Sequence, residues 1–114
     1  MRILVVEDSL VAAMALEEEL EERLHQVRIA GSLRGAREWM AEERYDAALL
    51  DMHLPDGPSD ALAAELERAG CIVALVSGID AGDVPSTLEH LPLFQKPIQP
   101  AILASWIDSL LQPD

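Results

Sequence analysis

The chain has 114 residues, which is the length of one ordinary domain. It carries 21 Asp and Glu residues against 8 Lys and Arg residues, so its formal charge is −13. This balance argues against nucleic-acid binding and against docking on anionic membranes, because both need clustered basic side chains. The hydrophobic fraction of 50% is too high for a disordered chain and is sufficient for one core.

Cysteine content and apolar run lengths narrow the class further. Cys71 is the single cysteine, so the chain can form no internal disulfide, and a cysteine-based metal site is not expected. No apolar run approaches the roughly 18 residues of a membrane-spanning helix. Residues 1–6 are too short for a signal peptide and run directly into acids. We therefore expect a cytoplasmic protein.

The chain begins with the pattern of a buried strand followed by an amphipathic helix. Residues 3–6 are a short, β-branched apolar run and predict the strand. Ser9 is a suitable N-cap for the helix, and the acid-rich segment 17–22 predicts its solvated face. The expected apolar face recurs at spacings of three or four and consists of Leu10, Ala13, Leu16, Leu20 and Leu24.

The next segment repeats this alternation. Residues 27–30 predict a second strand, and Ser32 is a suitable cap for a helix that continues to Met40. Residues 47–50 predict a third buried strand, which ends at Asp51. The pattern of strand, helix and strand is typical of a parallel sheet.

The second half of the chain contains two more strands and two or three helices. The Pro-Asp-Gly-Pro sequence at 55–58 predicts a turn, and Asp60 is a suitable cap for a helix that Gly70 ends. Residues 71–76 predict the fourth and most apolar strand. The remaining elements follow in order, namely a short helix between 85 and 90, a short strand at 93–95 and a last helix that begins near Pro100. Together they predict an α/β fold, a doubly wound five-stranded parallel sheet with helices on both faces.

Polar residues follow four of the predicted strands at the edge where open parallel sheets bind ligands. Glu7 and Asp8 follow the first strand and Asp51 the third, whereas Ser77 and Lys96, the only lysine, follow the fourth and fifth. Three carboxylates in one pocket repel each other, so we expect a divalent cation there, and Mg²⁺ accepts such ligands together with waters and a phosphate oxygen. A carboxylate nucleophile beside a hydroxyl and an ammonium suits phosphoryl transfer through an acyl phosphate.

The chain resembles a response-regulator receiver domain along essentially all of its 114 residues. The resemblance rests on four segments in order, which are residues 3–8, residues 49–57, residues 76–78 and Lys96-Pro97. It implies a flavodoxin-like sheet with strand order 2-1-3-4-5, and one receiver domain over residues 1–114 with no output domain. The glycine after the hydroxyl and the lack of the usual aromatic resemble a subgroup of stand-alone receivers from alphaproteobacteria.

The resemblance also implies a role for each residue of the site. Asp51 falls on the phosphoacceptor position, Ser77 on the switch hydroxyl and Lys96 on the lysine that is invariant in the family. The Lys96–Pro97 bond is expected to be cis, as in most relatives. The implied Mg²⁺ ligands are Glu7, Asp8, Asp51 and the backbone carbonyl of His53.

Two departures from the family pattern concern the switch. Leu93 stands where relatives carry an aromatic residue, three positions before the lysine. Phe94 is adjacent, but strand alternation should point it to the opposite face, which puts the usual coupling between Ser77 and an aromatic side chain in doubt. Lys96 also follows Ser77 by 19 residues, a few fewer than is usual.

The leading hypothesis is a phosphoacceptor module of a two-component phosphorelay, and not an enzyme. Asp51 would receive a phosphoryl group from a histidine kinase or a phosphotransfer protein, and output would pass to an unidentified downstream protein or relay. One alternative is a non-phosphorylated pseudo-receiver that only binds a partner. Another is a Mg²⁺-dependent aspartyl-phosphate phosphatase, although residues 7–10 lack the Asp-x-Asp pair of such enzymes. A homodimer is a further alternative that the sequence leaves open.

Several remaining residues have simpler interpretations. His25 and His90 lack partners nearby in sequence and are expected at the surface. Cys71 is expected in the core, and Trp39 and Trp106 are expected to pack helices, with an interface as the alternative for Trp106.

Overall fold

The computed structural model describes residues 1–78 and 84–111. A five-stranded sheet runs through its centre with the order β2-β1-β3-β6-β7, and every neighbouring pair is parallel. This arrangement confirms the predicted strand order. The strands are β1 (Arg2–Val6), β2 (Gln26–Ala30), β3 (Ala47–Asp51), β6 (Ile72–Ser77) and β7 (Leu93–Gln95).

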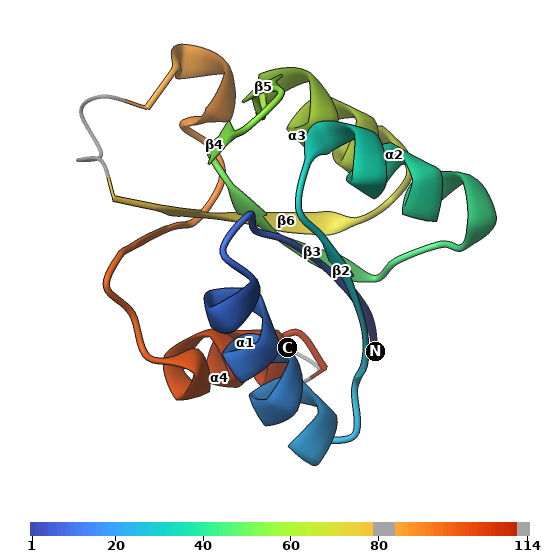
Figure 1. The fold of residues 1–114 in the computed structure, drawn as a ribbon, viewed down its shortest axis with the longest axis vertical. Coiled ribbons are helices and arrows are strands. Elements are labelled where there is room, and N and C mark those ends of the chain that lie inside the picture. Colours follow the sequence, from blue (N-terminus) through green and yellow to red (C-terminus); the bar gives the residue numbers. More distant parts are fainter. Residues whose placement is uncertain (79–83, 112–114) are drawn as a thin grey trace.

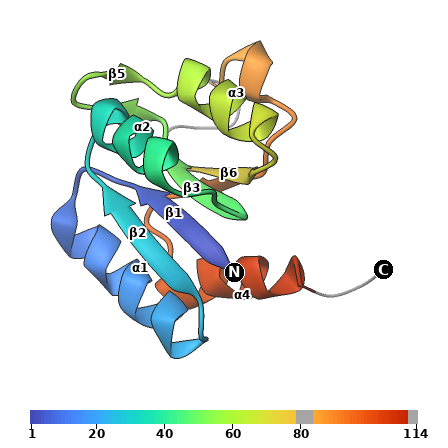
Figure 2. The ribbon, with the colours of Figure 1, turned by 90° about the vertical axis from the view of Figure 1, so that its right-hand side faces the viewer.

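Helices cover both faces of the sheet, as the sequence predicts. Helices α1 and α4 lie on one face and α2 and α3 on the other (Figures 1 and 2). The bounds are α1 (Leu10–Glu22), α2 (Leu33–Glu42), α3 (Asp60–Arg68), the short 3₁₀ helix η2 (Ser86–Leu88) and α4 (Pro100–Ser109). Within the two described ranges, no helix combines the length and apolar character needed to cross a bilayer.

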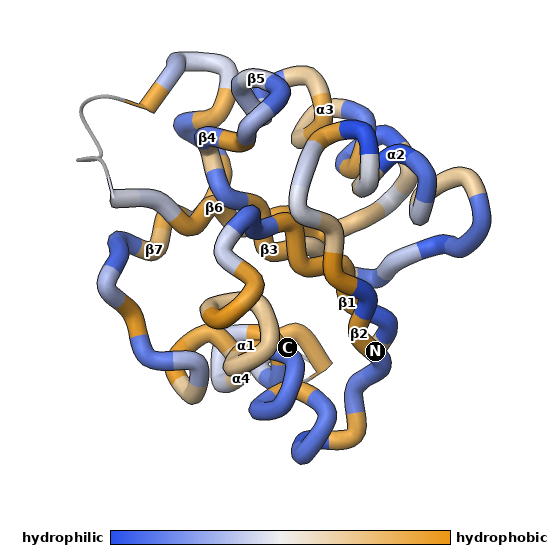
Figure 3. The backbone as a smooth tube through the Cα atoms, in the orientation of Figure 1, coloured by the Kyte–Doolittle hydropathy of each residue, from blue (hydrophilic) through white to orange (hydrophobic). Residues whose placement is uncertain are grey.

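The strands are buried on both faces because helices cover both. In β1, Ile3 and Val5 pack toward α1 and α4, whereas Leu4 and Val6 pack toward α2 and α3, and all four are at most 1% exposed. Figure 3 shows the apolar colour concentrated in these central strands. The sheet therefore divides the core into two apolar layers, which is the expected consequence of two-residue alternation.

The same alternation separates Leu93 from Phe94, as predicted. Leu93 packs against the layer beneath α2 and α3, and Phe94 against the layer beneath α1 and α4. There the Phe94 ring meets Trp106 edge-on, with centroids 5.8 Å apart. On the other face, the indole N–H of Trp39 donates to the Ile29 carbonyl at 3.1 Å, so both tryptophans pack helices onto the sheet.

The prediction that His25 lies at the surface is wrong. Its side chain is buried between the N-terminus and α4, where Nε2 lies 2.7 Å from Asp108 and Nδ1 lies 3.1 Å from the amino group of Met1. An ammonium can only donate, so Nδ1 accepts and Nε2–H donates to Asp108. Both ring nitrogens are thus satisfied, which permits burial. His90 is exposed and contacts Glu67, as a surface histidine should.

Both ends of the predicted apolar face of α1 are exposed. Leu10 is 63% exposed and Leu24 is 91% exposed, and only the middle of the series packs on the sheet. Leu24 has a positive φ of 69°, and it follows the helix rather than belonging to it. A new feature of the turn region is a small antiparallel hairpin of β4 (His53–Leu54) and β5 (Gly57–Pro58).

Helices α1 and α3 end in the same hydrogen-bonded motif. After α1, His25 N–H donates to the Leu20 carbonyl and Leu24 N–H to the Glu21 carbonyl. After α3, Cys71 and Gly70 donate in the same pattern. This is the Schellman arrangement, which places one residue in the left-handed region. Gly70 holds that position after α3, with φ 87°, but a leucine holds it after α1.

Leu24→Gly is expected to stabilise the protein. The left-handed conformation costs a leucine roughly 1–2 kcal/mol, while a glycine loses about 0.4–1 kcal/mol more unfolded-state entropy. Because the exposed Leu24 side chain contributes little packing, the free energy of unfolding should rise by about 0.5–1 kcal/mol in urea denaturation. As the matched control, Gly70→Ala should lower it by about 1 kcal/mol. A less stable Leu24→Gly variant would contradict this account.

Candidate functional site

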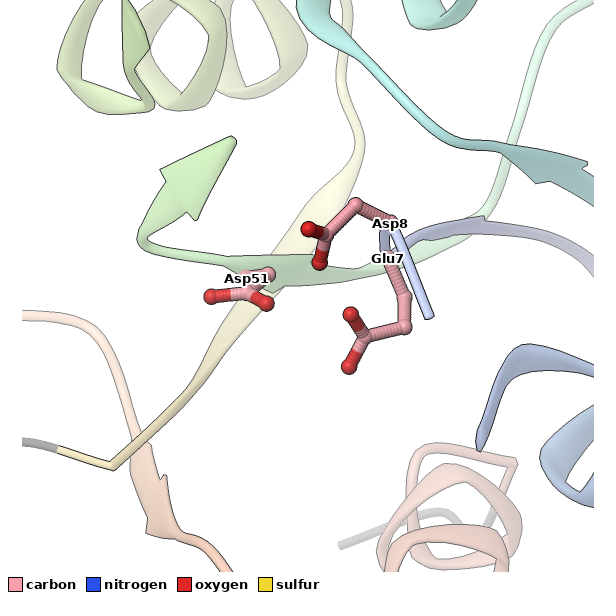
Figure 4. Close-up of side chains that lie close together, drawn as sticks. All are labelled: Glu7, Asp8 and Asp51. Atoms are coloured by element: carbon pink, nitrogen blue, oxygen red, sulfur yellow. The ribbon is translucent and has the colours of Figure 1, made fainter. Parts of the chain in front are cut away.

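Three carboxylates converge where β1 and β3 end. Val6 and Leu50 are register partners in these neighbouring strands, so the residues that follow them, Glu7 and Asp51, emerge side by side. Each of Glu7, Asp8 and Asp51 offers a carboxylate oxygen, and these oxygens lie within 4.8 Å of one another. Figure 4 shows the three side chains facing a common space. The structure thus brings together the acids that the sequence places at this edge.

Lys96 reaches the same cluster from the loop after β7. Its Nζ lies 2.6 Å from Glu7 Oε1 and 3.0 Å from Asp51 Oδ2. Partial burial disfavours the charged ammonium, but the hydrogen bonds to Glu7 and Asp51 outweigh that effect and raise the pKa of Lys96. Lys96 therefore remains a cation at neutral pH, held between two nearly buried carboxylates.

The charge and chemistry of this cluster fit a hard divalent cation. One ammonium beside three carboxylates leaves two negative charges uncompensated. Clustered carboxylate oxygens are the ligands that Mg²⁺ takes in proteins, usually together with water and phosphate oxygens. The donor set therefore suits the ion that the sequence indicates.

Backbone groups and a buried serine hold Asp51 in place. Its Oδ1 accepts a hydrogen bond from the His53 N–H at 3.2 Å, and its backbone carbonyl accepts one from the Ser59 hydroxyl. Ser59 is 1% exposed. Sequence analysis missed this residue, and Asp60 was expected to cap α3. In fact α3 begins at Asp60, and Ser59 occupies the N-cap position without a capping bond because its hydroxyl binds Asp51.

His53 and Ser77 are close to Asp51, the first along the chain and the second in the register of the sheet. His53 is exposed and contacts Asp51 through its backbone N–H. Ser77 is buried at the end of β6, one residue beyond Val76, the register partner of Asp51. The carbonyl of Ser77 accepts a hydrogen bond from the Lys96 N–H at 2.7 Å. The Lys96–Pro97 peptide bond is cis, as the resemblance implies.

A second unforeseen residue, Asp56, ties the loop after Asp51 to α2. Its two carboxylate oxygens accept from the N–H groups of Leu33 and Arg34, at 2.8 and 3.0 Å. The Ser32 hydroxyl accepts from the next N–H, that of Gly35. The first three free N–H groups of α2 are therefore satisfied. These backbone hydrogen bonds lower the pKa of Asp56 below its ordinary value.

The site opens on a mostly apolar cavity of about 540 Å³ between α1 and α4. Glu7, Asp51 and Lys96 line its polar end, and Ala13, Leu16 and Leu103 are among the apolar residues farther in. Asp51 is thus approachable from this side of the molecule.

The chain belongs to the response regulator receiver domain family, whose pattern matches residues 3–90. It is similar to a CheY-like receiver domain from Methylobacillus flagellatus, with 29% identity, a TM-score of 0.83, and coverage of 96% of this chain and 98% of that one. A CheY-like receiver from Methanospirillum hungatei JF-1 is 25% identical, with a TM-score of 0.85 and coverage of 96% and 92%.

A third structure supports the fold alone. A two-component response regulator from Clostridium difficile is 20% identical, with a TM-score of 0.87 and coverage of 97% of this chain and 95% of that one. No curated protein sequence matches the chain.

The contact between Asp56 and α2 should make the free energy of unfolding depend on pH in the acidic range. A carboxyl group whose pKa is lowered on folding stabilises the protein above its ordinary pKa of 3.8, and that stabilisation is lost as the pH falls through the folded value. Asp56→Ala should therefore be less stable than wild type at about pH 6, and this difference should shrink as the pH falls below 3.8. Urea denaturation across this pH range measures the difference.

Asp56→Asn is the matched control for that experiment. It keeps one acceptor oxygen but does not titrate, so its difference from Asp56→Ala should not vary with pH. A difference between wild type and Asp56→Ala that stays constant down to pH 3 would show that the carboxylate charge plays no part.

Proposed function

We propose that this receiver domain is a phosphoacceptor module, which takes a phosphoryl group on Asp51 from a histidine kinase or a phosphotransfer protein. The observation that carries the proposal is the contact of the Asp51 carboxylate with Lys96 inside a three-acid cluster. An isolated surface aspartate would have neither the compensating cation nor the clustered acids.

The transfer requires few changes at the protein. An oxygen of Asp51 forms a bond to phosphorus while the bond from phosphorus to the donor nitrogen breaks, and that nitrogen keeps the electron pair. Lys96 already contacts Asp51 Oδ2, so its ammonium is close enough to neutralise charge on the incoming phosphoryl oxygens. In the proposed arrangement, the Ser77 hydroxyl donates to one of those oxygens.

The proposed Mg²⁺ ligands are Glu7, Asp8, Asp51 and the backbone carbonyl of His53. The ion supplies positive charge for the phosphoryl oxygens when it is bound. Because Lys96 contacts both Glu7 and Asp51, the ammonium and the metal draw on the same two carboxylates. We infer that Lys96 lowers the affinity of the site for Mg²⁺ and also supplies positive charge for the phosphoryl group.

The remaining proposals concern partners and surroundings. The domain would act in the cytoplasm, with no nucleic-acid or membrane ligand, and would signal through a downstream protein or a further relay step. The charge of −13 supports the absence of a phosphate-rich partner. A role as an enzyme is not proposed, since the site suits a single transfer to Asp51 followed by slow hydrolysis.

Incubation with acetyl phosphate and Mg²⁺ should phosphorylate the wild type, and Asp51→Asn should abolish the added mass in intact-protein mass spectrometry. Asp60→Asn is the control, because it removes a nearby carboxylate that lies outside the cluster. Equal labelling of wild type and Asp51→Asn would refute the assignment of the phosphoacceptor. No labelling of the wild type by acetyl phosphate or by any histidine kinase would favour the pseudo-receiver alternative, for which Leu93 in place of the usual aromatic gives some grounds.

Lys96→Met should bind Mg²⁺ more tightly than wild type, while it accepts phosphate more slowly. A unit charge about 5 Å from a divalent ion in a water-like dielectric opposes binding by roughly 1–2 kcal/mol, so affinity should rise roughly fivefold to thirtyfold. Isothermal titration calorimetry measures this change. As a control, Arg34→Met removes an exposed cation on α2 and should leave the Mg²⁺ affinity unchanged. Weaker Mg²⁺ binding by Lys96→Met would contradict the idea that Lys96 and Mg²⁺ compete for the same carboxylates.

A further inference from the structure

Two arginines stand apart from the other cations of this acidic chain. Six of the eight Lys and Arg side chains form ion pairs with carboxylates. Among the residues that the structure describes, Arg44 and Arg68 form none. Both arginines line the same cavity, and the charge of Arg68 also lowers the pKa of Glu65.

This cavity lies at the edge of the sheet opposite the acidic cluster. It has a volume of about 310 Å³ and is formed where α2 leads into β3 and α3 leads into β6. The two helices lie next to each other over the same face of the sheet (Figures 1 and 2). Met40, Leu66 and Cys71 supply apolar wall, and burial raises the pKa of the Cys71 thiol to about 12, so that it stays protonated.

Tyr45 contributes a hydroxyl group that lacks a partner. The residue lines the cavity and is 7% exposed, and within the described ranges its buried hydroxyl makes no hydrogen bond. A buried hydroxyl without a partner costs free energy, and native proteins seldom retain one. Burial also raises the pKa of Tyr45, so the group is a neutral donor at physiological pH.

The residues that line the cavity include two arginines and one carboxylate, that of Glu43, and Asp46 lies close enough to act on the Cys71 thiol. The Glu43 carboxylate is already engaged by Arg2 at 3.2 Å and by Arg28 at 3.3 Å. The ends of α2 and α3 attract cations through the helix dipoles, which favours the placement of Arg44 and Arg68. The dipoles account neither for the cavity nor for the unpartnered Tyr45 hydroxyl.

We propose that this cavity binds a small organic anion, a carboxylate carried on a compact apolar body. Arg44 and Arg68 would pair with the carboxylate, and the apolar body would rest on the wall around Leu66. The volume is at the lower end of the range for ligand sites, which begins at about 300 Å³. The proposal is independent of phosphorylation, because none of these residues belongs to the acidic cluster.

Benzoate and its neutral analogue benzamide are the probes that test this site. In a titration followed by ¹H–¹⁵N NMR, benzoate should shift the amides of residues 40–45 and 66–71, with an affinity at least tenfold higher than that of benzamide. Equal affinities, or shifts confined to other segments, would overturn the proposal. This comparison uses the wild-type protein and does not depend on the folding of a variant.

Variants then assign the binding groups. The double variant Arg44→Gln/Arg68→Gln should lose at least tenfold in benzoate affinity, whereas the charge-matched Arg34→Gln/Arg37→Gln, on the exposed part of α2, should not. Asp51→Asn should bind benzoate as wild type does, so that failure of this site and failure of the phosphoacceptor are separate results. Unchanged affinity in Arg44→Gln/Arg68→Gln would overturn the proposal.

Discussion

The ammonium of Lys96 contacts two carboxylates at the ends of different strands, and the arrangement of the acidic cluster depends on that contact. Glu7 and Asp51 are nearly buried beside Asp8, and without a cation they would repel each other. Lys96 reaches them from beyond β7, past the end of β6. The three-residue edge strand β7 thus has a part in the site, because it holds the Lys96 backbone against the Ser77 carbonyl.

The two edges of the sheet have opposite chemistry. Acids gather where the strands end, and the two arginines without ion pairs gather where β3 and β6 begin. This separation places the proposed phosphoacceptor and the proposed anion site at opposite ends of the same central strands.

The sequence predicts a feature well where that feature is set by neighbouring residues or by a regular spacing of apolar residues. Apolar runs predict all five sheet strands, and the residues after them predict the acidic cluster, because parallel strands end at one edge. His25 was misjudged because its partners are 24 and 83 residues away. Asp56 and Ser59 were missed for a similar reason, since each binds a backbone group of another segment. The β4–β5 hairpin has strands of two residues, which are too short for any periodicity.

The positions of the two tryptophans have a practical consequence. Trp39 is a residue of α2, and the guanidinium of Arg28 lies 5.2 Å from the centre of its ring. On the opposite face of the sheet, Trp106 meets Phe94, and Phe94 is two residues before Lys96. The chain therefore carries one tryptophan on each side of the sheet, and its sequence contains no third tryptophan. Replacing either tryptophan by phenylalanine leaves an emission signal that reports on a single layer of the core, the one near the lysine or the one near the basic cavity.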